Sequence, residues 1–178
     1  MLRQFLAKRQ FSAGLASQDK QFFRMQSLYQ GYFSHEHQRK IVCIGRNYHA
    51  HIAELNNSLP EEPMWFDKPL SALLTPGQVL KLEESHVDVH HEVELGVIIG
   101  MRGRNIRPED VHRHIAGYFV GVDFCNRVLQ RQNKDDGSDW SMAKGSNQFA
   151  VVSDFIHKSA VPDSGNVELE LQINGETR

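Results

Sequence analysis

The sequence predicts an α+β fold in which strands predominate. Two long apolar segments, residues 90–100 (HHEVELGVIIG) and 117–124 (GYFVGVDF), have the composition of buried strands. Shorter strand candidates lie at residues 41–45 and 167–174, and helical character is confined to three short stretches. A chain of 178 residues is long enough for one domain with a sizeable core, and a second full domain is not expected.

Each element follows from local signals, beginning with the extended ones. Residues 41–45 (IVCIG) form an apolar run that ends in glycine, which indicates a strand. Residues 59–80 contain four prolines, and these restrict the stretch to loops and short extended pieces.

The three helix candidates carry start or stop signals. Residues 47–57 predict a short helix that ends at an Asn-Asn pair. Residues 106–116 place Pro108 at a helix start, with two acidic residues in the first turn, where the helix dipole favours them. Residues 126–137 predict another helix that ends near Gly137.

The C-terminal stretch alternates apolar and polar residues and then reaches Asn174-Gly175, a strong hairpin signal. We expect a strand whose apolar face is formed by Val167, Leu169, Leu171 and Ile173. A hairpin calls for a return strand, and the chain ends at Arg178. We therefore expect the domain to be incomplete at its C-terminus, with this face under-covered.

The N-terminal 18 residues differ from the rest in composition. They contain Arg3, Lys8 and Arg9 and no acidic residue, which is typical of a mitochondrial transit peptide. A disordered start without targeting function is the alternative. Residues 19–40 are polar with scattered aromatics and predict a linker or lead-in. We expect the mature protein in the mitochondrial matrix.

Bulk composition excludes several classes of partner. The formal net charge is -2, so no overall basic field indicates nucleic-acid binding. No apolar run approaches the roughly 20 residues of a membrane helix. Cys43 and Cys125 are far apart without a CxxC motif, which favours reduced thiols of an intracellular protein over a disulfide framework.

Three carboxylates accompany the two long apolar segments. Glu92 and Glu94 stand two apart at the entrance of the first, and Asp123 lies near the end of the second. A Glu-x-Glu pair usually marks the solvated face of a strand. Here the flanking residues are apolar on both faces, and buried carboxylates need partners, which suggests a bound cation. All-oxygen ligands favour Mg²⁺, Mn²⁺ or Ca²⁺.

His90 and His91 adjoin these acids, but His91 should face away from Glu92, and neither is expected to be a ligand.

Five segments together resemble the fumarylacetoacetate hydrolase family, and most closely its small mitochondrial branch of acylpyruvases that also decarboxylate oxaloacetate. The resemblance extends over residues 41–178 and rests on these segments in order: IVCIGRNYHAHIAEL, FDKPLSALL, HHEVELGVIIG, GYFVGVDFCNRVLQ and WSMAKGSNQF. It implies a mixed, rolled-up β-sheet fold with a few helices, forming the catalytic domain of a homodimer when complete. The family's usual threonine-containing substrate loop, beyond Asn-Gly, is absent from this chain, which leaves the activity of this form open.

The resemblance also implies a role for individual residues. Glu92, Glu94 and Asp123 match the family's ligands for Mg²⁺ or Mn²⁺. Lys144 matches its active-site lysine. The remaining matches are the water-activating pair His51 and Glu54, and the substrate-side residues Arg46, Lys68 and Gln130.

The predicted function is Mg²⁺-dependent hydrolysis of acylpyruvates, decarboxylation of oxaloacetate, or both, with a small oxo or diketo acid as substrate. One alternative keeps the fold and changes the reaction to that of an isomerase or hydratase of aromatic degradation. Another is a non-catalytic remnant that binds a full-length partner through its open edge.

Overall fold

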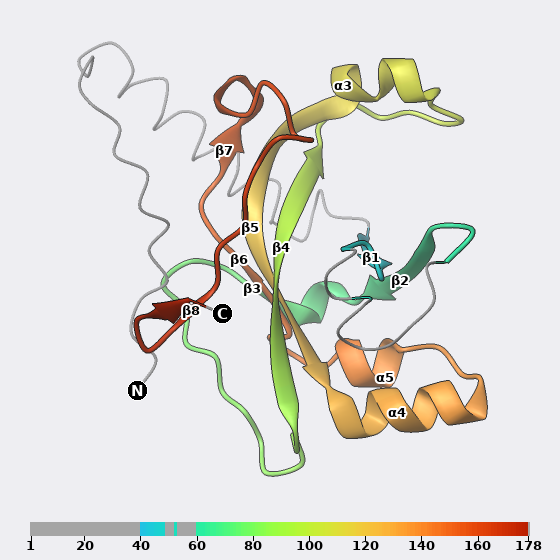
Figure 1. Cartoon of the computed structure of the whole chain (residues 1–178), viewed down its shortest axis with the longest axis vertical. Coiled ribbons are helices and arrows are strands. Elements are labelled where there is room, and N and C mark those ends of the chain that lie inside the picture. The colour runs from blue at the N-terminus through green and yellow to red at the C-terminus, as the bar shows by residue number, and fades with distance from the viewer. Residues whose placement is uncertain (1–39, 49–51, 53–59, 178) are drawn as a thin grey trace. The chain divides into compact units, whose positions relative to one another are not determined.

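The computed structural model describes residues 40–48, 52 and 60–177 (Figure 1). The predicted transit peptide, the lead-in up to residue 39 and most of the predicted helix at 47–57 lie outside these residues. Predictions about those segments stay predictions.

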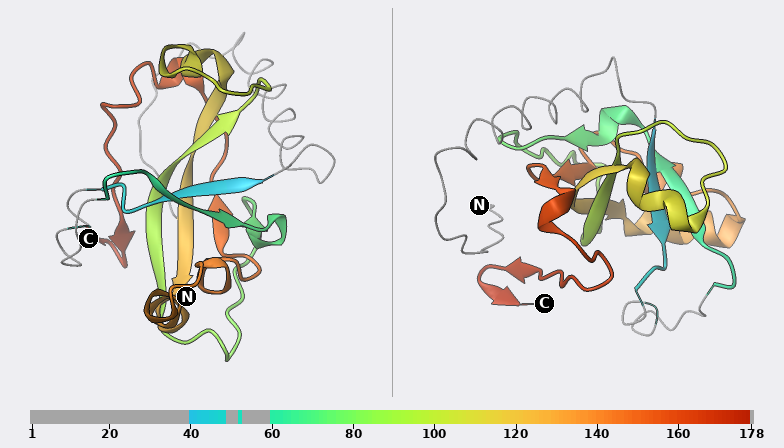
Figure 2. Two further views of the ribbon diagram at one scale, coloured as in Figure 1. Left: turned by 90° about the vertical axis from the view of Figure 1, so that its right-hand side faces the viewer. Right: turned by 90° about the horizontal axis from the view of Figure 1, so that it is seen from above.

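The described chain is mainly β, as predicted, and its strands form three groups. β1 (Ile41–Gly45) pairs antiparallel with β2 (Met64–Lys68). A five-stranded sheet has the order β3 (Leu73–Leu74), β6 (Ala150–Val152), β5 (Ile115–Asn126) and β4 (Val89–Ile99), with β7 (Ile156–His157) paired to β5. β3 and β6 are parallel whereas β5 and β7 are antiparallel, so the sheet is mixed. β4 and β5 run side by side in every view (Figures 1 and 2).

The chain divides into two compact units. Among the described residues, the first unit contains residues 93–121 and 153–177, and the second contains the segments up to 92 together with 122–152. β4 and β5 each continue from one unit into the other, because the division falls within both strands.

The helices are short, as the sequence predicts. Pro108 begins a 3₁₀ turn, η2 (Pro108–Asp110), which leads into α3 (Val111–His114). α4 (Arg127–Asp136) follows β5 directly, and α5 (Ser141–Lys144) lies beside it (Figure 1). The other turns are η1 (Leu70–Ala72) and η3 (Lys158–Ala160). Within the described part of the chain, no helix is long and apolar enough to cross a membrane.

The ends of α4 show why its limits could be predicted. The Asn126 side chain accepts a hydrogen bond from the Leu129 N–H at 3.2 Å, which caps the first turn. Gly137 ends the helix with φ of 67°, a left-handed conformation that glycine adopts without steric cost.

The core of the second unit lies against the end of β5. Val122, Phe124 and Phe149 are buried together, and partly buried apolar residues pack around them: Leu80, Val89 and Val151. The last residues of β5 are therefore covered on both faces, which agrees with the apolar character of 117–124.

The C-terminal strand prediction is wrong in its extent. Only β8 (Gln172–Ile173) and β9 (Glu176–Thr177) pair, around Asn174 and Gly175 with φ of 54° and 89°. This confirms the predicted turn, whose two central residues both need positive φ. Residues 167–171 form no strand. Alternation alone does not create a strand, because the ladder also needs a partner.

A buried cluster of lysines and carboxylates as candidate active site

Lys144 lies at the centre of a charged cluster inside the second unit. It ends α5, whose start is fixed by the Asp139 carboxylate, which accepts a hydrogen bond from the Ser141 N–H at 2.7 Å. The Lys144 side chain is 2% exposed, and its Nζ donates to Glu92 Oε2 at 2.7 Å and to Asp123 Oδ2 at 2.8 Å. The same nitrogen lies 5.2 Å from the centre of the Phe66 ring. One ammonium group therefore joins β4, β5 and α5.

Lys68, at the end of β2, is the second buried cation. Its Nζ donates to the carbonyls of Phe124 at 3.2 Å and Phe149 at 3.0 Å, and to the carbonyl of Lys144 as well. The ammonium also lies 2.7 Å from Asp123 Oδ1, as an ion pair outside hydrogen-bond geometry. Lys68 therefore holds the main chain on both sides of the cluster and is 3% exposed.

The two carboxylates of the cluster are matched oxygen by oxygen. Glu92 Oε1 pairs with Arg127 at 2.8 Å, while its other oxygen pairs with Lys144. Asp123 divides its oxygens between Lys68 and Lys144. Three cationic and two anionic side chains leave an excess of one positive charge in this cluster.

Burial and charge act on the two lysines with opposite net results. Burial lowers the pKa of Lys68 and outweighs the opposing effect of Asp123. Burial also acts to lower the pKa of Lys144, but the charges of Asp123 and Glu92 together raise that pKa above its usual value. Lys144 is thus held in its protonated, cationic form. Burial raises the pKa of the nearby Cys125 thiol to about 11, so this cysteine is a poor nucleophile.

Arg127 was not predicted from the sequence. It follows the Asn126 cap as the first residue of α4, is 13% exposed, and also donates to the Gln130 side chain at 2.6 Å. Its Nε is buried without a hydrogen-bond partner in the described structure. The signal available in the sequence was its position, because Arg127 directly follows the buried strand that contains Asp123.

The predicted site residues have different places. Lys68, Lys144, Glu92 and Asp123 meet in the cluster, and Gln130 contacts it through Arg127. Arg46 is partly buried beyond β1, with φ of 52°. His51 and Glu54 lie outside the described residues.

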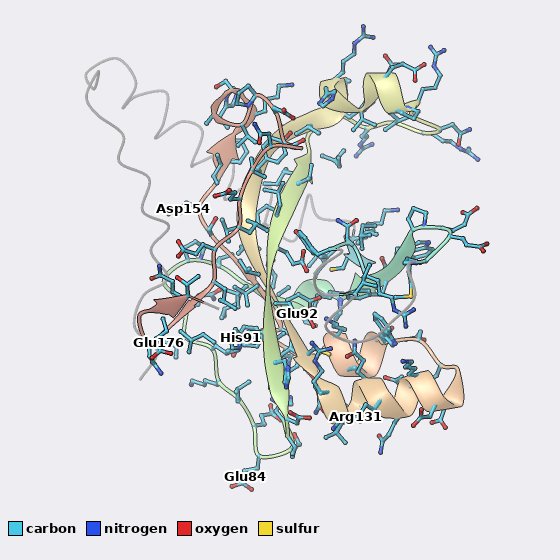
Figure 3. All side chains as sticks on the ribbon, in the orientation of Figure 1. Glu84, His91, Glu92, Arg131, Asp154 and Glu176 are labelled. Carbon is cyan, nitrogen blue, oxygen red and sulfur yellow. The ribbon has the colours of Figure 1, made fainter. Side chains whose placement is uncertain are left out.

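The strand alternation predicted around Glu92 is confirmed. His91 and Glu92 point to opposite sides of β4 (Figure 3). The His91 ring lies 6.4 Å from the Phe124 ring, a packing role, and His90 contacts Asp88 at 3.2 Å. Glu94 lies two residues further along the same strand, in the first unit.

The donor chemistry of the cluster fits a hard divalent cation. Carboxylate oxygens of Glu92 and Asp123 converge on a single point, at which the Lys144 ammonium lies. Oxygen donors of this kind suit Mg²⁺ or Mn²⁺. In the described part of the chain, however, no three acidic, histidine or cysteine side chains form a ready metal-binding group. The Lys144 ammonium already pairs with two of the predicted ligands, and the meeting of Glu92, Glu94 and Asp123 around one ion stays a prediction.

Sequence comparison identifies the family. The profile described as "Fumarylacetoacetate (FAA) hydrolase C-terminal" matches residues 40–178. The chain belongs to the fumarylacetoacetate hydrolase family. A mitochondrial oxaloacetate tautomerase of Arabidopsis thaliana is 42% identical over 139 residues, which are 78% of this chain and 62% of that protein. A mitochondrial oxaloacetate decarboxylase of Dictyostelium discoideum is 40% identical over 143 residues, 79% of this chain and 65% of the relative. The chain thus spans somewhat less than two thirds of these family members.

Solved structures of the family have the same fold. A fumarylacetoacetate hydrolase family protein from Yersinia pestis matches with a TM-score of 0.74 at 38% identity, covering 78% of this chain and 64% of that one. Fumarylpyruvate hydrolase from Pseudomonas aeruginosa, solved in complex with Mn²⁺ and pyruvate, matches with a TM-score of 0.71 at 32% identity, covering 79% and 62%. The expected mixed β fold of this family is confirmed.

Proposed function

We propose that the protein is a metal-dependent enzyme acting on small oxo acids, and that its first substrate is oxaloacetate, which it tautomerises between enol and keto forms. The observation that carries the proposal is the buried, protonated Lys144 between Glu92 and Asp123. Relatives named oxaloacetate tautomerase and oxaloacetate decarboxylase support the choice of substrate.

Charge balance favours a dianionic oxo acid. The cluster has one excess positive charge, and a divalent cation together with the Glu94 carboxylate would raise the excess to two. A low-dielectric site holds such an excess poorly unless the ligand neutralises it. Oxaloacetate at neutral pH supplies two negative charges, so it matches this excess.

The residues of the chain have separable roles in this chemistry. Glu92, Glu94 and Asp123 would hold Mg²⁺ or Mn²⁺, which when bound polarises the oxo group as a Lewis acid. Lys144 presents its ammonium to the negative charge that develops on the substrate enolate, in a site where water is largely excluded. Lys68 fixes the carbonyl of Lys144 and the Asp123 carboxylate, and Arg127 orients Glu92.

Decarboxylation of oxaloacetate and C–C hydrolysis of acylpyruvates share this requirement, because both release the enolate of pyruvate. Hydrolysis is the second candidate, and the relative solved with Mn²⁺ and pyruvate favours it. It also needs an activated water, the role proposed for His51 oriented by Glu54. Arg46 and Gln130 are proposed to contact the substrate.

The test is a direct assay of the three reactions. The purified chain, with Mn²⁺ or Mg²⁺, is given enol-oxaloacetate, keto-oxaloacetate and acetylpyruvate, and ketonisation and pyruvate release are followed separately. Because the chain spans somewhat less than two thirds of these relatives, a full-length relative is assayed as the second sample. Lys144→Met should abolish each activity that the unmodified protein has. Activity that survives this change, or is indifferent to metal removal, contradicts the proposal.

We also propose mitochondrial targeting by residues 1–18, which the names of several relatives support. A fluorescent fusion without these residues should stay in the cytosol. Import of that shortened fusion would contradict the targeting role. Homodimer formation is a further proposal, which sedimentation of the purified protein tests.

A further inference from the structure

Lys144 lies between two of the three carboxylates that are proposed to hold the metal ion. Its Nζ is within 2.8 Å of one oxygen from Glu92 and one from Asp123. Two buried carboxylates that approach a common point repel each other unless a cation lies between them. We propose that Lys144 is a place-holding cation, which keeps the two carboxylates in position without metal and is displaced from them when a divalent ion binds. The inference rests on the metal dependence in the proposed function.

The contacts of the two buried lysines show which one can leave. Among the described residues, the Lys144 ammonium donates hydrogen bonds only to the two carboxylates, and it lies over the face of the Phe66 ring. A divalent ion would neutralise those same carboxylates and remove the attraction that holds the ammonium. Lys68 instead donates to three main-chain carbonyls, which an ion on the carboxylates does not replace. Lys68 therefore stays in place while Lys144 moves.

Displacement would also set an order of binding. Without metal, the Lys144 ammonium is engaged by Glu92 and Asp123 and is not available to a substrate oxyanion. After the ion binds, the ammonium is released within the site and can meet the negative charge of an oxo acid. Metal binding should therefore precede productive substrate binding. By thermodynamic linkage, the Lys144 ammonium must weaken metal binding to the same extent as the metal weakens the contacts of the ammonium with the carboxylates.

Metal affinity provides the first test, because the expected sign is unusual. Calorimetric titration with Mn²⁺ compares the unmodified chain with Lys144→Met, Lys144→Arg and Lys68→Met. Removing the competing ammonium should tighten Mn²⁺ binding by about tenfold or more. Lys144→Arg keeps the charge and should show no such gain. Equal or weaker Mn²⁺ binding by Lys144→Met would overturn the inference, since a lysine that merely supports the site would give that result.

Thermal unfolding provides the second test, independent of activity. In EDTA, Lys144→Met should unfold at a lower temperature than the unmodified chain, because its carboxylates are left facing each other. At saturating Mn²⁺ this difference should disappear, whereas the loss caused by Lys68→Met should persist. A Lys144→Met protein that Mn²⁺ does not restore would overturn the inference.

The two proposals fail differently. An unmodified protein that binds no Mn²⁺ contradicts the metal-dependent function, and the inference with it. An unmodified protein that binds Mn²⁺, together with a Lys144→Met protein that gains neither affinity nor metal-restored stability, contradicts the inference alone.

Discussion

The charged cluster around Lys144 and the ion pairs of residues 107–113 use the same chemical groups in opposite surroundings. In the cluster, the ammonium of Lys144 is 2% exposed and its carboxylate contacts are 2.7 and 2.8 Å long. In the segment 107–113, Arg107 is 74% exposed and lies 3.5 Å from Glu109 and 3.6 Å from Asp110. Arg113 lies 3.1 Å from the same Asp110.

The difference lies in what happens when one partner is removed. Water solvates the remaining ion of an exposed pair, so such pairs contribute about 0–1 kcal/mol. A buried ion that loses its partner has no such replacement, and breaking a buried pair costs about 3–5 kcal/mol. A buried pair nevertheless adds little net stability to the fold, because both ions lose their hydration when the pair is buried. Net stability alone therefore does not account for the cluster, which agrees with the catalytic role proposed for it.

The largest expected effect comes from Asp123→Asn, which removes the anion that both buried lysines share. We expect the free energy of unfolding to fall by about 3–5 kcal/mol, because two ammonium groups would remain buried, of which only that of Lys144 keeps a carboxylate partner, Glu92. Urea denaturation followed by circular dichroism measures the change. A loss below about 1 kcal/mol, the range of surface pairs, would show that the cluster opens to water.

Lys68→Met should have a smaller effect of the same kind. Methionine approximates the volume of the aliphatic part of lysine but leaves the carbonyls of Phe124, Phe149 and Lys144 without this donor. Phe149 O still accepts from the Phe124 N–H at 3.0 Å, but buried acceptors that are left unsatisfied cost about 1–3 kcal/mol. The same urea titration measures the loss.

The pH dependence of this loss has a definite sign. Burial lowers the pKa of Lys68 in the folded state below its ordinary value of 10.5, so the unfolded state binds more protons between the two values. The stability of the unmodified chain relative to Lys68→Met should therefore rise as pH increases through the folded pKa, and should be constant at lower pH. A difference that falls with rising pH would contradict the lowered pKa.

The sequence predicted the elements more completely than the site. Long apolar strands and a helix with an Asn cap and a terminal glycine are encoded locally, so β4, β5 and α4 appear where they were expected. The extent of a C-terminal strand depends on a partner strand, which no local pattern reports, and residues 167–171 were misjudged for this reason.

Residues of the cluster were conspicuous in the sequence where an acid stands in an apolar run, whereas Arg127 was missed because its contacts depend on the fold. Glu92 and Asp123 were conspicuous in the sequence because burial of a carboxylate is costly. Lys144 and Lys68 gained meaning only through the family resemblance, since an isolated lysine has no periodic signal. The internal neutralisation of the carboxylates by these lysines and Arg127 depends on contacts between residues distant in the sequence, and could not be predicted.

Asp110→Asn provides the matched case with solvent-exposed partners, because Asp110 is 28% exposed and Arg107 and Arg113 are 74% and 77% exposed. Asp110 pairs with both Arg107 and Arg113, so it has the same number of cationic partners as Asp123. We expect a loss of about 0–1 kcal/mol, decreasing further at high NaCl concentration because salt screens exposed charges. Urea denaturation at low and high salt measures both values. A loss as large as that of Asp123→Asn would mean that partner number, rather than burial, controls the cost.

The smallest expected effect, and the one that separates burial from pairing most directly, concerns Asp88. Its carboxylate, 37% exposed, accepts a hydrogen bond from Arg131 at 3.0 Å and lies 3.2 Å from His90. The hydrogen bond from Arg131, followed by the charges of Arg131 and His90, lowers the pKa of Asp88 below its ordinary value of 3.8. An Asp88→Asn change should add no backbone strain of its own, because φ at this position is 53°, a left-handed value that asparagine tolerates as well as aspartate does.

A carboxyl group whose pKa is lower in the folded than in the unfolded state stabilises the fold above its unfolded pKa, and this contribution is lost as pH falls through the folded value. The unmodified chain should therefore exceed Asp88→Asn slightly in stability at neutral pH, and the difference should decline below about pH 4. Unfolding temperatures of the two proteins from neutral pH down to about pH 3 measure it, with Arg131→Met as the control that removes the same pair from its other side. A difference that is independent of pH would assign the effect to packing at the start of β4. A decline with falling pH would show that even an exposed ion pair contributes measurably to stability. The larger loss expected for Asp123→Asn would then be attributed to burial.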